Sequence, residues 1–588
     1  TKGYSLFINS FYRIRADIGR VSKGLRITTA GPKADIYVFT GSVLENMEEY
    51  TALTGKPLLP PAWVFEPWAG GGVGRWMDGP THDVIQEMEG VVRKFKNLDI
   101  PHSGLYAEGA GWKWEDHYNK EEIYKIAAFT KQQKMRVFSW QFSHLDMEQA
   151  KELLPNCAEE DLPITRTPGY HGEKVLPCAI DFSHPRAEEL LENQWHDRMD
   201  AGFDGTMVDF GEIIPDEAVF YDGRTGDEMH NAYALDYTKA YRKLFEKYKG
   251  EDHVLFSRSA AAGVQKYSCQ FGGDQLSSFR GLTYAMNGGL TLAASGFPFW
   301  GVDAGGYSGF ADEETYLRWT EFAAFSPIMR FHGVTPREPW AYSRYAVSVY
   351  KFYAWLRENL LKYSVHTAEE AHKTGIPMMR PLPMVFPKDK EAVYWEDEYF
   401  YGSDLLAAPV HQEGEQRRIY FPAGRWINLL DFRKMVGGNR ILQVDVPIDK
   451  IPVYIQEGAC ILSVMNGELQ LGQSMTYEKK NTVLMSRALN ETSGKRYADG
   501  KEIEYNILGQ TGEDFFILRH ASETEFIVLL GFDRKPESLE LNGISLSEGA
   551  SLNALNYGSG WYWREDTAVI VSVPKLEKTE IHVVYKEQ

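Results

Sequence analysis

The sequence predicts an α/β protein in which a (β/α)8 TIM barrel is flanked by an N-terminal β-sandwich portion and two C-terminal β-sandwich domains. Apolar, β-prone runs alternate with amphipathic helical patterns between residues 61 and 385, which indicates parallel β/α units. Outside this range the helical patterns give way to short strands separated by turn residues. The length of 588 residues also exceeds what one hydrophobic core can organise, so several domains are expected.

Residues 1–60 are expected to form the end of a β-sandwich. Three strand patterns and one helical pattern occur there: Tyr4–Asn9, Arg26–Thr29, Asp35–Thr40 and Asn46–Thr54. The proline-rich segment 55–61 predicts a linker and a domain boundary near residue 60. Because the chain opens inside a strand-like run and begins with Thr1 instead of methionine, we expect part of this domain to lie upstream.

The segment 61–385 carries the pattern of a barrel. Strands are expected near Val64–Trp68, Ser103–Ala107, Arg136–Trp140, Gly205–Phe210, Val254–Ser257, Cys269–Gly272, Phe297–Val302 and Ile328–His332. Helices are expected at Thr81–Lys96, Glu121–Gln133, Pro185–Ala201, His230–Lys249, Gly281–Ala294, Glu313–Phe325 and Ala346–Tyr363. Residues 143–181 are long for a βα loop and have little periodicity, so we expect a functional insertion over the barrel mouth.

After residue 385 turn residues recur at short intervals, which predicts two β-sandwiches in series. We place the proximal one at 386–466 and the distal one at 467–588. Early strands are expected at Ala392–Tyr394, Leu405–Pro409, Arg417–Phe421 and Val453–Ile455.

The composition excludes several classes of function. A net charge of −19 argues against nucleic acid or an anionic membrane surface as partner. No apolar run approaches the roughly 18 residues of a transmembrane helix, and no signal-peptide pattern is present. The 4 cysteines lack C-x-x-C spacing, so we expect no disulfide framework, no zinc site and a cytoplasmic location, although a signal upstream of Thr1 stays open. A homo-oligomer is compatible with the sequence.

Polar side chains end most of the predicted barrel strands. They are Glu66, Glu108, Trp140, Asp209, Glu212, Arg258, Asp274, Trp300, Asp303 and His332. Carboxylates at the carboxyl ends of parallel barrel strands are typical of catalytic sites. Two carboxylates at one rim can cleave a glycosidic bond, since one attacks the anomeric carbon and the other protonates the leaving oxygen. Asp209 is the strongest candidate, because it ends an apolar run and is followed by Phe210, Gly211 and Glu212.

Other chemistries fit less well. No H-E-x-x-H spacing supports a metal site, and no G-x-S-x-G elbow supports a serine nucleophile. Asp209-Phe210-Gly211 spells the magnesium-binding triplet of kinases, but the H-R-D loop and the V-A-I-K strand are missing. For Arg258 and His332 the alternative is a structural ion pair or a buried core histidine, and for Trp140 and Trp300 it is packing in the barrel wall.

Four motifs resemble glycoside hydrolase family 31, which includes α-glucosidases, α-xylosidases and sulfoquinovosidases. They are the D-F-G-E form of the nucleophile motif at 207–212, R-S-x-x-A-G-x-Q-K-Y at 258–267, G-G-D at 272–274 and a D-A-G-G-Y strand end at 303–307. The resemblance covers nearly the whole chain. It implies that Asp209 is the nucleophile and Asp274 the acid/base, and that Arg258, Asp303 and His332 bind sugar hydroxyls at the −1 subsite. No cofactor or metal is implied.

The resemblance therefore implies a retaining α-glycoside hydrolase that releases a terminal non-reducing sugar from an oligosaccharide or small α-glycoside. Glu108 stands where the family's α-glucosidases place an aspartate, and Met207 replaces a common tryptophan, so plain α-glucosidase specificity is in question. The loop 109–117 lacks the arginine of sulfoquinovosidases, whereas Tyr307 and Gln275 favour that specificity slightly. The longer reach of Glu108 would suit an α-galactoside.

Two further functions stay open. A transglycosylase would use the same site with a sugar hydroxyl as the attacking group. A non-catalytic carbohydrate-binding protein would keep the fold, but binding alone does not need the pair Asp209 and Asp274.

Overall fold

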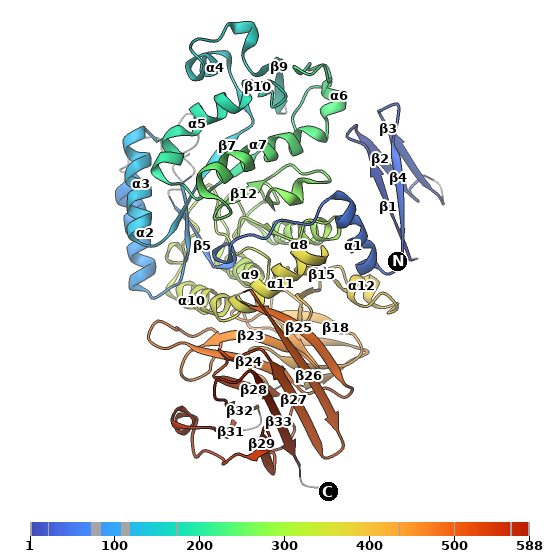
Figure 1. Cartoon of the computed structure of the whole chain (residues 1–588), viewed down its shortest axis with the longest axis vertical. Helices are drawn as coiled ribbons and strands as arrows, with labels where there is room; N and C mark the ends of the chain where they lie inside the picture. Colours follow the sequence, from blue (N-terminus) through green and yellow to red (C-terminus); the bar gives the residue numbers. More distant parts are fainter. Residues whose placement is uncertain are drawn as a thin grey trace.

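The computed structural model describes residues 3–21, 23–71, 84–107, 118–171, 174–433, 435–498, 500–564 and 567–585. Figure 1 shows the barrel in the upper part of the view, with the N-terminal strands beside it and the C-terminal sheets below it. Helices α10 (Arg344–Asn359) and α11 (Leu361–Thr374) lie between the barrel and these sheets.

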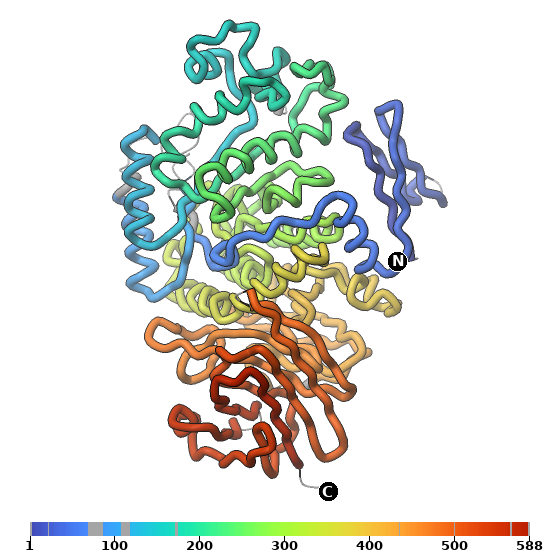
Figure 2. Tube along the Cα trace, in the orientation of Figure 1, coloured from blue at the N-terminus to red at the C-terminus, as the bar shows by residue number. Residues whose placement is uncertain are grey.

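The N-terminal part consists of two 2-stranded antiparallel sheets and a helix. Strand β1 (Tyr4–Asn9) pairs with β4 (Asp35–Thr40), and β2 (Ile14–Ile18) pairs with β3 (Leu25–Thr29). Strand β2 was not predicted, because its charged residues interrupt the apolar pattern. Helix α1 (Val43–Thr54) begins at a capping box of Ser42 and Glu45. Figure 2 traces, in blue, the segment that leads from α1 along the barrel to its first strand.

The barrel is built on a 7-stranded parallel sheet. In spatial order its strands are β14 (Trp300–Gly301), β13 (Cys269–Phe271), β12 (Val254–Ser257), β11 (Gly205–Asp209), β7 (Arg136–Phe142), β6 (Gly104–Ala107) and β5 (Trp68–Gly71). Residues 328–331 close it, since the Trp68 N–H donates to the Met329 carbonyl at 2.9 Å and the Ala304 N–H donates to the Arg330 carbonyl at 3.0 Å. The predicted (β/α)8 barrel is thereby confirmed.

One predicted barrel strand, Val64–Trp68, is wrong except at its last residue. Ala62–Phe65 form a 3-10 turn, η1, and β5 begins only at Trp68. Pro61 starts this turn, and its carbonyl accepts from the Val64 N–H at 3.0 Å. Glu66 consequently precedes β5 and lies at the opposite, N-terminal end of the barrel from the predicted site.

The barrel helices agree with their predicted positions to within a few residues. They are α2 (Val84–Asn97), α3 (Lys120–Gln132), α5 (Ala187–Ala201), α7 (Ala232–Lys249), α8 (Phe279–Ala294), α9 (Glu313–Ala324) and α10. The predicted end of the last helix at Tyr363 differs from the structure, which ends α10 at Asn359 and starts α11 at Leu361. The Asn359 amide donates to the Val464 carbonyl at 2.8 Å and accepts from the Gly472 N–H at 2.7 Å, so this helix end is bound to the distal sandwich.

The insertion at 143–181 is folded, although the sequence showed little periodicity there. It contains β8 (His144–Leu145), α4 (Met147–Leu153), β9 (Ile164–His171) and β10 (Lys174–Ile180), and its strands form a 3-stranded antiparallel sheet. Leu145, Ile164 and Ile180 pack into one buried cluster with Trp195 of α5 and Tyr241 of α7. A short helix, α6 (Gly226–Met229), precedes α7.

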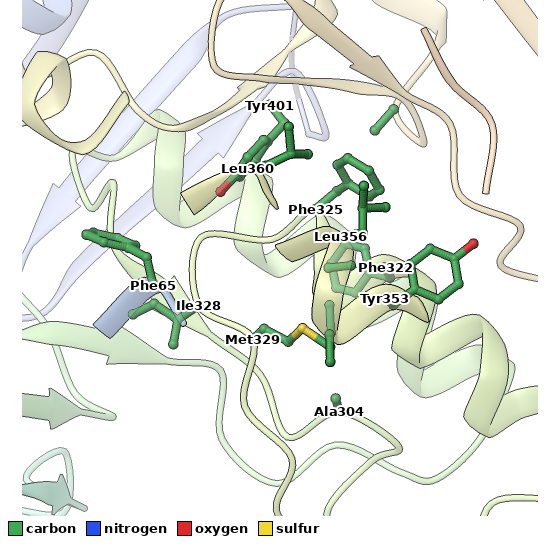
Figure 3. Close-up of a cluster of buried hydrophobic side chains, with 14 of the residues drawn as sticks. Phe65, Ala304, Phe322, Phe325, Ile328, Met329, Tyr353, Leu356, Leu360 and Tyr401 are labelled. Atoms are coloured by element: carbon green, nitrogen blue, oxygen red, sulfur yellow. The ribbon is translucent and has the colours of Figure 1, made fainter. Parts of the chain in front are cut away.

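The base of the barrel joins the proximal sandwich through a buried cluster. Figure 3 shows Phe65, Phe325, Ile328 and Leu356 together with Tyr401 of β16 (Tyr399–Tyr401). At the same place the guanidinium of Arg357 donates to the carbonyls of Phe65 at 2.7 Å and Ser326 at 2.7 Å and to the Tyr401 hydroxyl at 2.9 Å. Side chains from η1, α9, α10 and the sandwich therefore share one core.

The proximal C-terminal part has a 6-stranded sheet, a 2-stranded antiparallel sheet and a short helix, α12 (Leu382–Val385). The larger sheet is β15 (Met379–Pro381), β16, β17 (Leu405–Ala407), β22 (Val453–Gln456), β19 (Arg425–Asn428) and β20 (Met435–Gly437). The smaller sheet is β18 (Gln416–Phe421) with β21 (Arg440–Asp445). Ala392–Tyr394, expected as a strand, forms a 3-10 turn, because the Trp395 N–H turns back to the Ala392 carbonyl.

The distal part is a sandwich of two sheets. One is β23 (Cys460–Met465), β24 (Lys480–Ser486), β28 (Phe526–Leu530), β32 (Ala568–Ser572) and β31 (Gly560–Arg564). The other is β25 (Thr492–Ala498), β26 (Lys501–Gln510), β27 (Glu513–Arg519), β33 (Lys578–Val584), β29 (Ser538–Leu541) and β30 (Ile544–Ser545). Strand β23 pairs with β24, so this sheet begins before residue 466, the junction expected from the sequence. In the described part of the chain no helix has the length and apolar character needed to cross a membrane.

Candidate active site

A small cavity of about 160 Å³ opens at the carboxyl ends of the barrel strands. Its walls are Trp140, Met207, Asp209, Phe210, Arg258, Phe271, Asp274, Asp303, Tyr307 and His332. The structure therefore brings together six of the eight predicted site residues: Asp209, Asp274, Arg258, Asp303, His332 and Trp140. The volume lies below the roughly 300–1,000 Å³ of pockets for drug-sized ligands, so the cavity suits a small group such as one sugar ring.

Both carboxylate oxygens of Asp209 are held by hydrogen-bond donors. The Trp140 indole Nε1–H donates to Oδ2 at 2.9 Å, and the Phe210 backbone N–H donates to Oδ1 at 2.8 Å. The Arg258 Nη1 lies 3.1 Å from Oδ1. These donors come from β7, β11 and the end of β12, three neighbouring strands of the parallel sheet. Each of them stabilises the ionised carboxylate.

The turn after Asp209 is held in a conformation that few side chains adopt. Phe210 has φ +60° and Gly211 has φ +94°. A Cβ on Gly211 would lie 2.6 Å from the Ser259 hydroxyl, so the chain passes too close to β12 for a side chain there. The Arg258 guanidinium lies 3.9 Å from the centre of the Phe210 ring, which covers this cation beside the nucleophile candidate.

Arg258 links two acids of the motif. Besides Asp209, it contacts Glu212, whose Oε1 lies 2.6 Å from Nη2. The Glu212 side chain is about half exposed and does not line the cavity. Glu212 therefore contacts the site through the guanidinium.

The protonation of Asp209 reflects opposing effects. Burial raises the pKa of this carboxyl, while Arg258, the Trp140 indole and the Phe210 N–H lower it, and the charge of Asp274 raises it again. The net pKa lies above the ordinary aspartate value. Asp209 and Asp274 are thus electrostatically coupled across the cavity.

Asp274 follows β13 at the end of Gly272-Gly273, and its side chain is exposed at the cavity. Gly273 has φ +75°, a left-handed conformation that glycine adopts without strain. Asp274 therefore meets solvent, whereas Asp209 is buried.

The opposite wall carries a second buried acid. Asp303 is ion-paired with Arg330, and burial raises the pKa of Asp303 to about 7. His332 is buried between Tyr106 and Tyr307, with ring centres 4.5 and 5.4 Å away. Burial, followed by the charges of Arg330 and Arg337, lowers the pKa of His332 well below its usual range, so its imidazole is neutral at pH 7.

One predicted residue in the described part of the chain, Trp300, is not among the cavity walls. Trp300 is fully buried and faces away from the cavity toward α8, where a Cβ on Gly289 would lie 1.9 Å from its ring. Its prediction as a sugar-binding residue is corrected to packing between sheet and helix, because β14 directs this side chain outward. Glu108 lies outside the described residues.

Four cavity residues were not among the predicted catalytic and substrate-binding residues: Met207, Phe210, Phe271 and Tyr307. Met207 and Tyr307 had been considered only for the identity of the sugar. Strand alternation could have identified Met207, because residues i and i+2 of a strand share a face and Asp209 follows it by two. The position of Phe210 in the cavity wall depends on its left-handed turn, which no local sequence pattern predicts. Among the described residues no group of three or more His, Cys, Asp or Glu has the arrangement of a metal site.

The matching relatives share the fold over most of this chain. A solved structure, the cycloalternan-forming enzyme from Listeria monocytogenes in complex with a pentasaccharide substrate, superposes with a TM-score of 0.86 at 22% identity, covering 99% of this chain and 60% of that one. The isomaltosyltransferase of Sporosarcina globispora is 27% identical, over 96% of this chain and 57% of its own length. An alpha-xylosidase of Emericella nidulans is 28% identical, over 78% of this chain and 61% of its own length.

The chain thus spans about three fifths of the length of these relatives. Residues 375–461 match the glycosyl hydrolase family 31 C-terminal domain. Residues 57–367, more than half of the chain, match the glycosyl hydrolases family 31 TIM-barrel domain. With the barrel and its two strand-end acids in place, these matches show that the chain belongs to glycosyl hydrolase family 31.

Proposed function

We propose that this protein is a retaining α-glycoside hydrolase that releases a terminal non-reducing sugar through a glycosyl-aspartate intermediate. The observation that carries the proposal is the pair Asp209 and Asp274, which come from different barrel strands and line one small cavity. Retaining enzymes use two carboxyl groups about 5–5.5 Å apart, one as nucleophile and one as acid/base. The three donors on Asp209 favour its ionised form, as a nucleophile requires.

In the proposed first step, Asp209 attacks the anomeric carbon while Asp274 protonates the glycosidic oxygen of the leaving group. In the second step, Asp274 removes a proton from water, and the resulting attack on the ester frees Asp209 and releases the sugar. Asp303 and His332 line the buried wall, where they would accept and donate hydrogen bonds to hydroxyls of the bound sugar. Arg258 keeps its charge beside Asp209 throughout.

The sugar itself is proposed from the relatives. Their names describe isomaltosyl transfer, xylosidase activity and cycloalternan formation. We infer that an α-glucosyl or α-xylosyl group occupies the cavity, with α-galactosyl and sulfoquinovosyl groups as the alternatives that Glu108 and Tyr307 suggest. A panel of 4-nitrophenyl α-glycosides of glucose, xylose, galactose, N-acetylgalactosamine and sulfoquinovose distinguishes them. Absence of turnover on the whole panel would contradict a hydrolase.

The nucleophile is tested by substitution and by trapping. Asp209→Asn should lower kcat by on the order of 10³-fold or more and keep the melting temperature. Incubation of the wild-type protein with a fluorinated α-glycosyl fluoride should add one sugar to the peptide that contains Asp209, detected by mass spectrometry. A label on another peptide would overturn this assignment.

Asp204 provides a matched control on the same segment. It accepts from the Val137 N–H at 3.1 Å and pairs with Lys249 at 3.0 Å, at the end of β11 away from the cavity. Asp204→Asn should lower the melting temperature and leave kcat within about threefold of the wild type.

The stereochemistry of the reaction is a separate test. The anomeric configuration of the first product, followed by NMR, should be α, and a β product would contradict retention.

A transglycosylase is the second candidate, favoured by the likeness to an isomaltosyltransferase. A sugar hydroxyl would then replace water in the second step. Product analysis at high concentrations of the sugar acceptor separates the two, because a transferase accumulates longer saccharides while a hydrolase releases the free sugar.

A further inference from the structure

The loop that carries Asp274 is fastened to a second loop of the barrel rim. The Tyr307 and Ser308 N–H groups donate to the Gln275 carbonyl at 2.8 and 3.0 Å, and the Ser277 N–H donates to the Ser308 carbonyl at 3.0 Å. A Cβ on Gly306 would lie 2.5 Å from the Ser277 backbone, so the loops touch directly. The position of Asp274 therefore depends on residues 305–309.

One buried guanidinium holds both loops. Arg337 is 4% exposed and follows the eighth barrel strand. Its Nη2 donates to the Ser277 hydroxyl at 2.9 Å and to the Gly309 carbonyl at 2.9 Å, and its Nε donates to the Gly306 carbonyl at 2.8 Å. It also donates to the Tyr307 carbonyl at 3.2 Å. Among the described residues it forms no ion pair with a carboxylate. Its other partners include the carbonyls of Thr335 and Pro336, and the Tyr342 hydroxyl interacts with it as well.

The chain leaves space for this guanidinium. A Cβ on Gly305 would lie 2.8 Å from the Arg337 Cδ, and one on Gly333 would lie 2.7 Å from Nη2. Gly305 and Gly306 also have φ +89° and +79°, which other residues adopt only with strain. The planar fork of arginine reaches several oxygens at once, whereas a lysine amine would have to leave most of them unpaired.

We propose that Arg337 is a positioning residue for the acid/base, and that it fixes the loop of Asp274 so that this carboxyl reaches the leaving-group oxygen. The inference rests on the proposed function, in which Asp274 protonates the leaving group. Arg337 itself lies outside the walls of the cavity. Its charge also acts on His332 and Asp303. Because Arg337→Lys keeps that charge, its effect on activity is expected mainly in proton donation by Asp274.

This specificity is the basis of the test. Arg337→Lys is compared with the wild type on an α-glycosyl fluoride and on 4-nitrophenyl, 4-methoxyphenyl and methyl α-glycosides of the same sugar. A misplaced acid should lower kcat/KM about 10²-fold on the methyl glycoside, which has the poorest leaving group. It should change kcat/KM little on the glycosyl fluoride, because fluoride leaves without a proton. Asp274→Ala is the reference variant. Its kcat/KM should depend on the leaving group in the same way but more strongly.

Arg318→Lys is the matched control. Arg318 of α9 is also buried. It donates to the backbone carbonyls of Val446 at 2.9 Å and Lys450 at 3.0 Å, which belong to the proximal sandwich and not to the loop of Asp274. It should lower the melting temperature and leave the leaving-group dependence unchanged. Ser277→Ala removes only one acceptor of Arg337, and it should shift the leaving-group dependence in the same direction by a smaller factor if Arg337→Lys does not fold.

The outcomes separate the two proposals. If Asp274→Ala shows the leaving-group dependence while Arg337→Lys and Ser277→Ala lose activity equally on all substrates, or not at all, the positioning role is overturned and the proposed function stands. If the wild type is inactive, or Asp274→Ala shows no such dependence, the proposed function is overturned and this inference with it.

Discussion

At the scale of single residues, the environment of Asp209 is made by donors from neighbouring strand ends. The Trp140 indole, the Phe210 N–H and Arg258 all face its two oxygens, while burial works against ionisation. A charge-assisted hydrogen bond to a buried carboxylate contributes about 1.5–3 kcal/mol. The loss of one donor should therefore be measurable as a change in the acidity of Asp209.

Trp140→Phe removes the indole donor and keeps an aromatic ring. Because the donor stabilises the charged form, its loss raises the pKa of Asp209, and the proposed nucleophile then ionises at a higher pH. We expect kcat/KM to fall about 10-fold and the acidic limb of its pH profile to move to higher pH. Trp300→Phe is the control, since that ring packs against α8 outside the cavity. An unchanged acidic limb in Trp140→Phe would contradict this role of the indole.

At the scale of elements, helix α7 fixes the strand ends of the barrel from outside. The Tyr237 hydroxyl lies 3.1 Å from the Gln141 carbonyl of β7 and 3.2 Å from the Asp209 carbonyl of β11. One turn earlier, the Tyr233 hydroxyl lies 3.0 Å from the carbonyls of Ser143 and Ile180, which belong to the insertion. The same helix thus holds the strand of Asp209 and the base of the inserted sheet.

Tyr237→Phe and Tyr233→Phe form a matched pair on α7. Each leaves two buried carbonyls without this hydroxyl, so each should lower the free energy of unfolding by about 1–3 kcal/mol. Only Tyr237→Phe loosens Asp209, and we expect it alone to lower kcat, by about 10-fold. Denaturant unfolding and steady-state kinetics check both variants. Equal kcat values in the two would show that α7 contributes stability alone.

At the scale of the whole molecule, buried carboxyl groups couple the stability to pH. Glu398 in the proximal sandwich is fully buried, and burial raises its pKa to about 8, above the usual 4.5. The folded state therefore holds this proton more tightly than the unfolded chain does. The stability it contributes is complete below about pH 4.5 and is lost as the pH rises to about 8, at about 1.4 kcal/mol per pH unit at most.

Glu398→Gln replaces the carboxyl with a neutral group of similar shape. We expect the melting temperature of the wild type to fall between pH 5 and pH 8, and the variant to show a flatter dependence over the same range. Scanning calorimetry at a series of pH values checks this. Parallel curves for the two proteins would contradict the raised pKa of Glu398.

Local patterns predicted much of the fold. The strand β12 and the starts of β7 and β11 lie where β-prone runs occur, because buried parallel strands are continuous apolar runs. The strand β2, the turn η1 and the break between α10 and α11 were missed. Proline at Pro61 and the bonds of Asn359 to the distal sandwich override the local preference there. The insertion was missed as a folded unit because its core is completed by α5 and α7.

The sequence by itself determined the barrel, its order of strands and helices, the β-rich flanks and the positions of Asp209, Asp274 and Asp303 at the ends of barrel strands, since all of these follow from local periodicity and residue type. Only the tertiary structure decided that Trp140 donates to Asp209 while Trp300 packs outward, and that Arg337 binds the loop of Asp274 from sixty residues away along the chain. The direction of a side chain depends on the register of its strand and on its neighbours across the sheet. These contacts are distant in sequence, and therefore no local pattern encodes them.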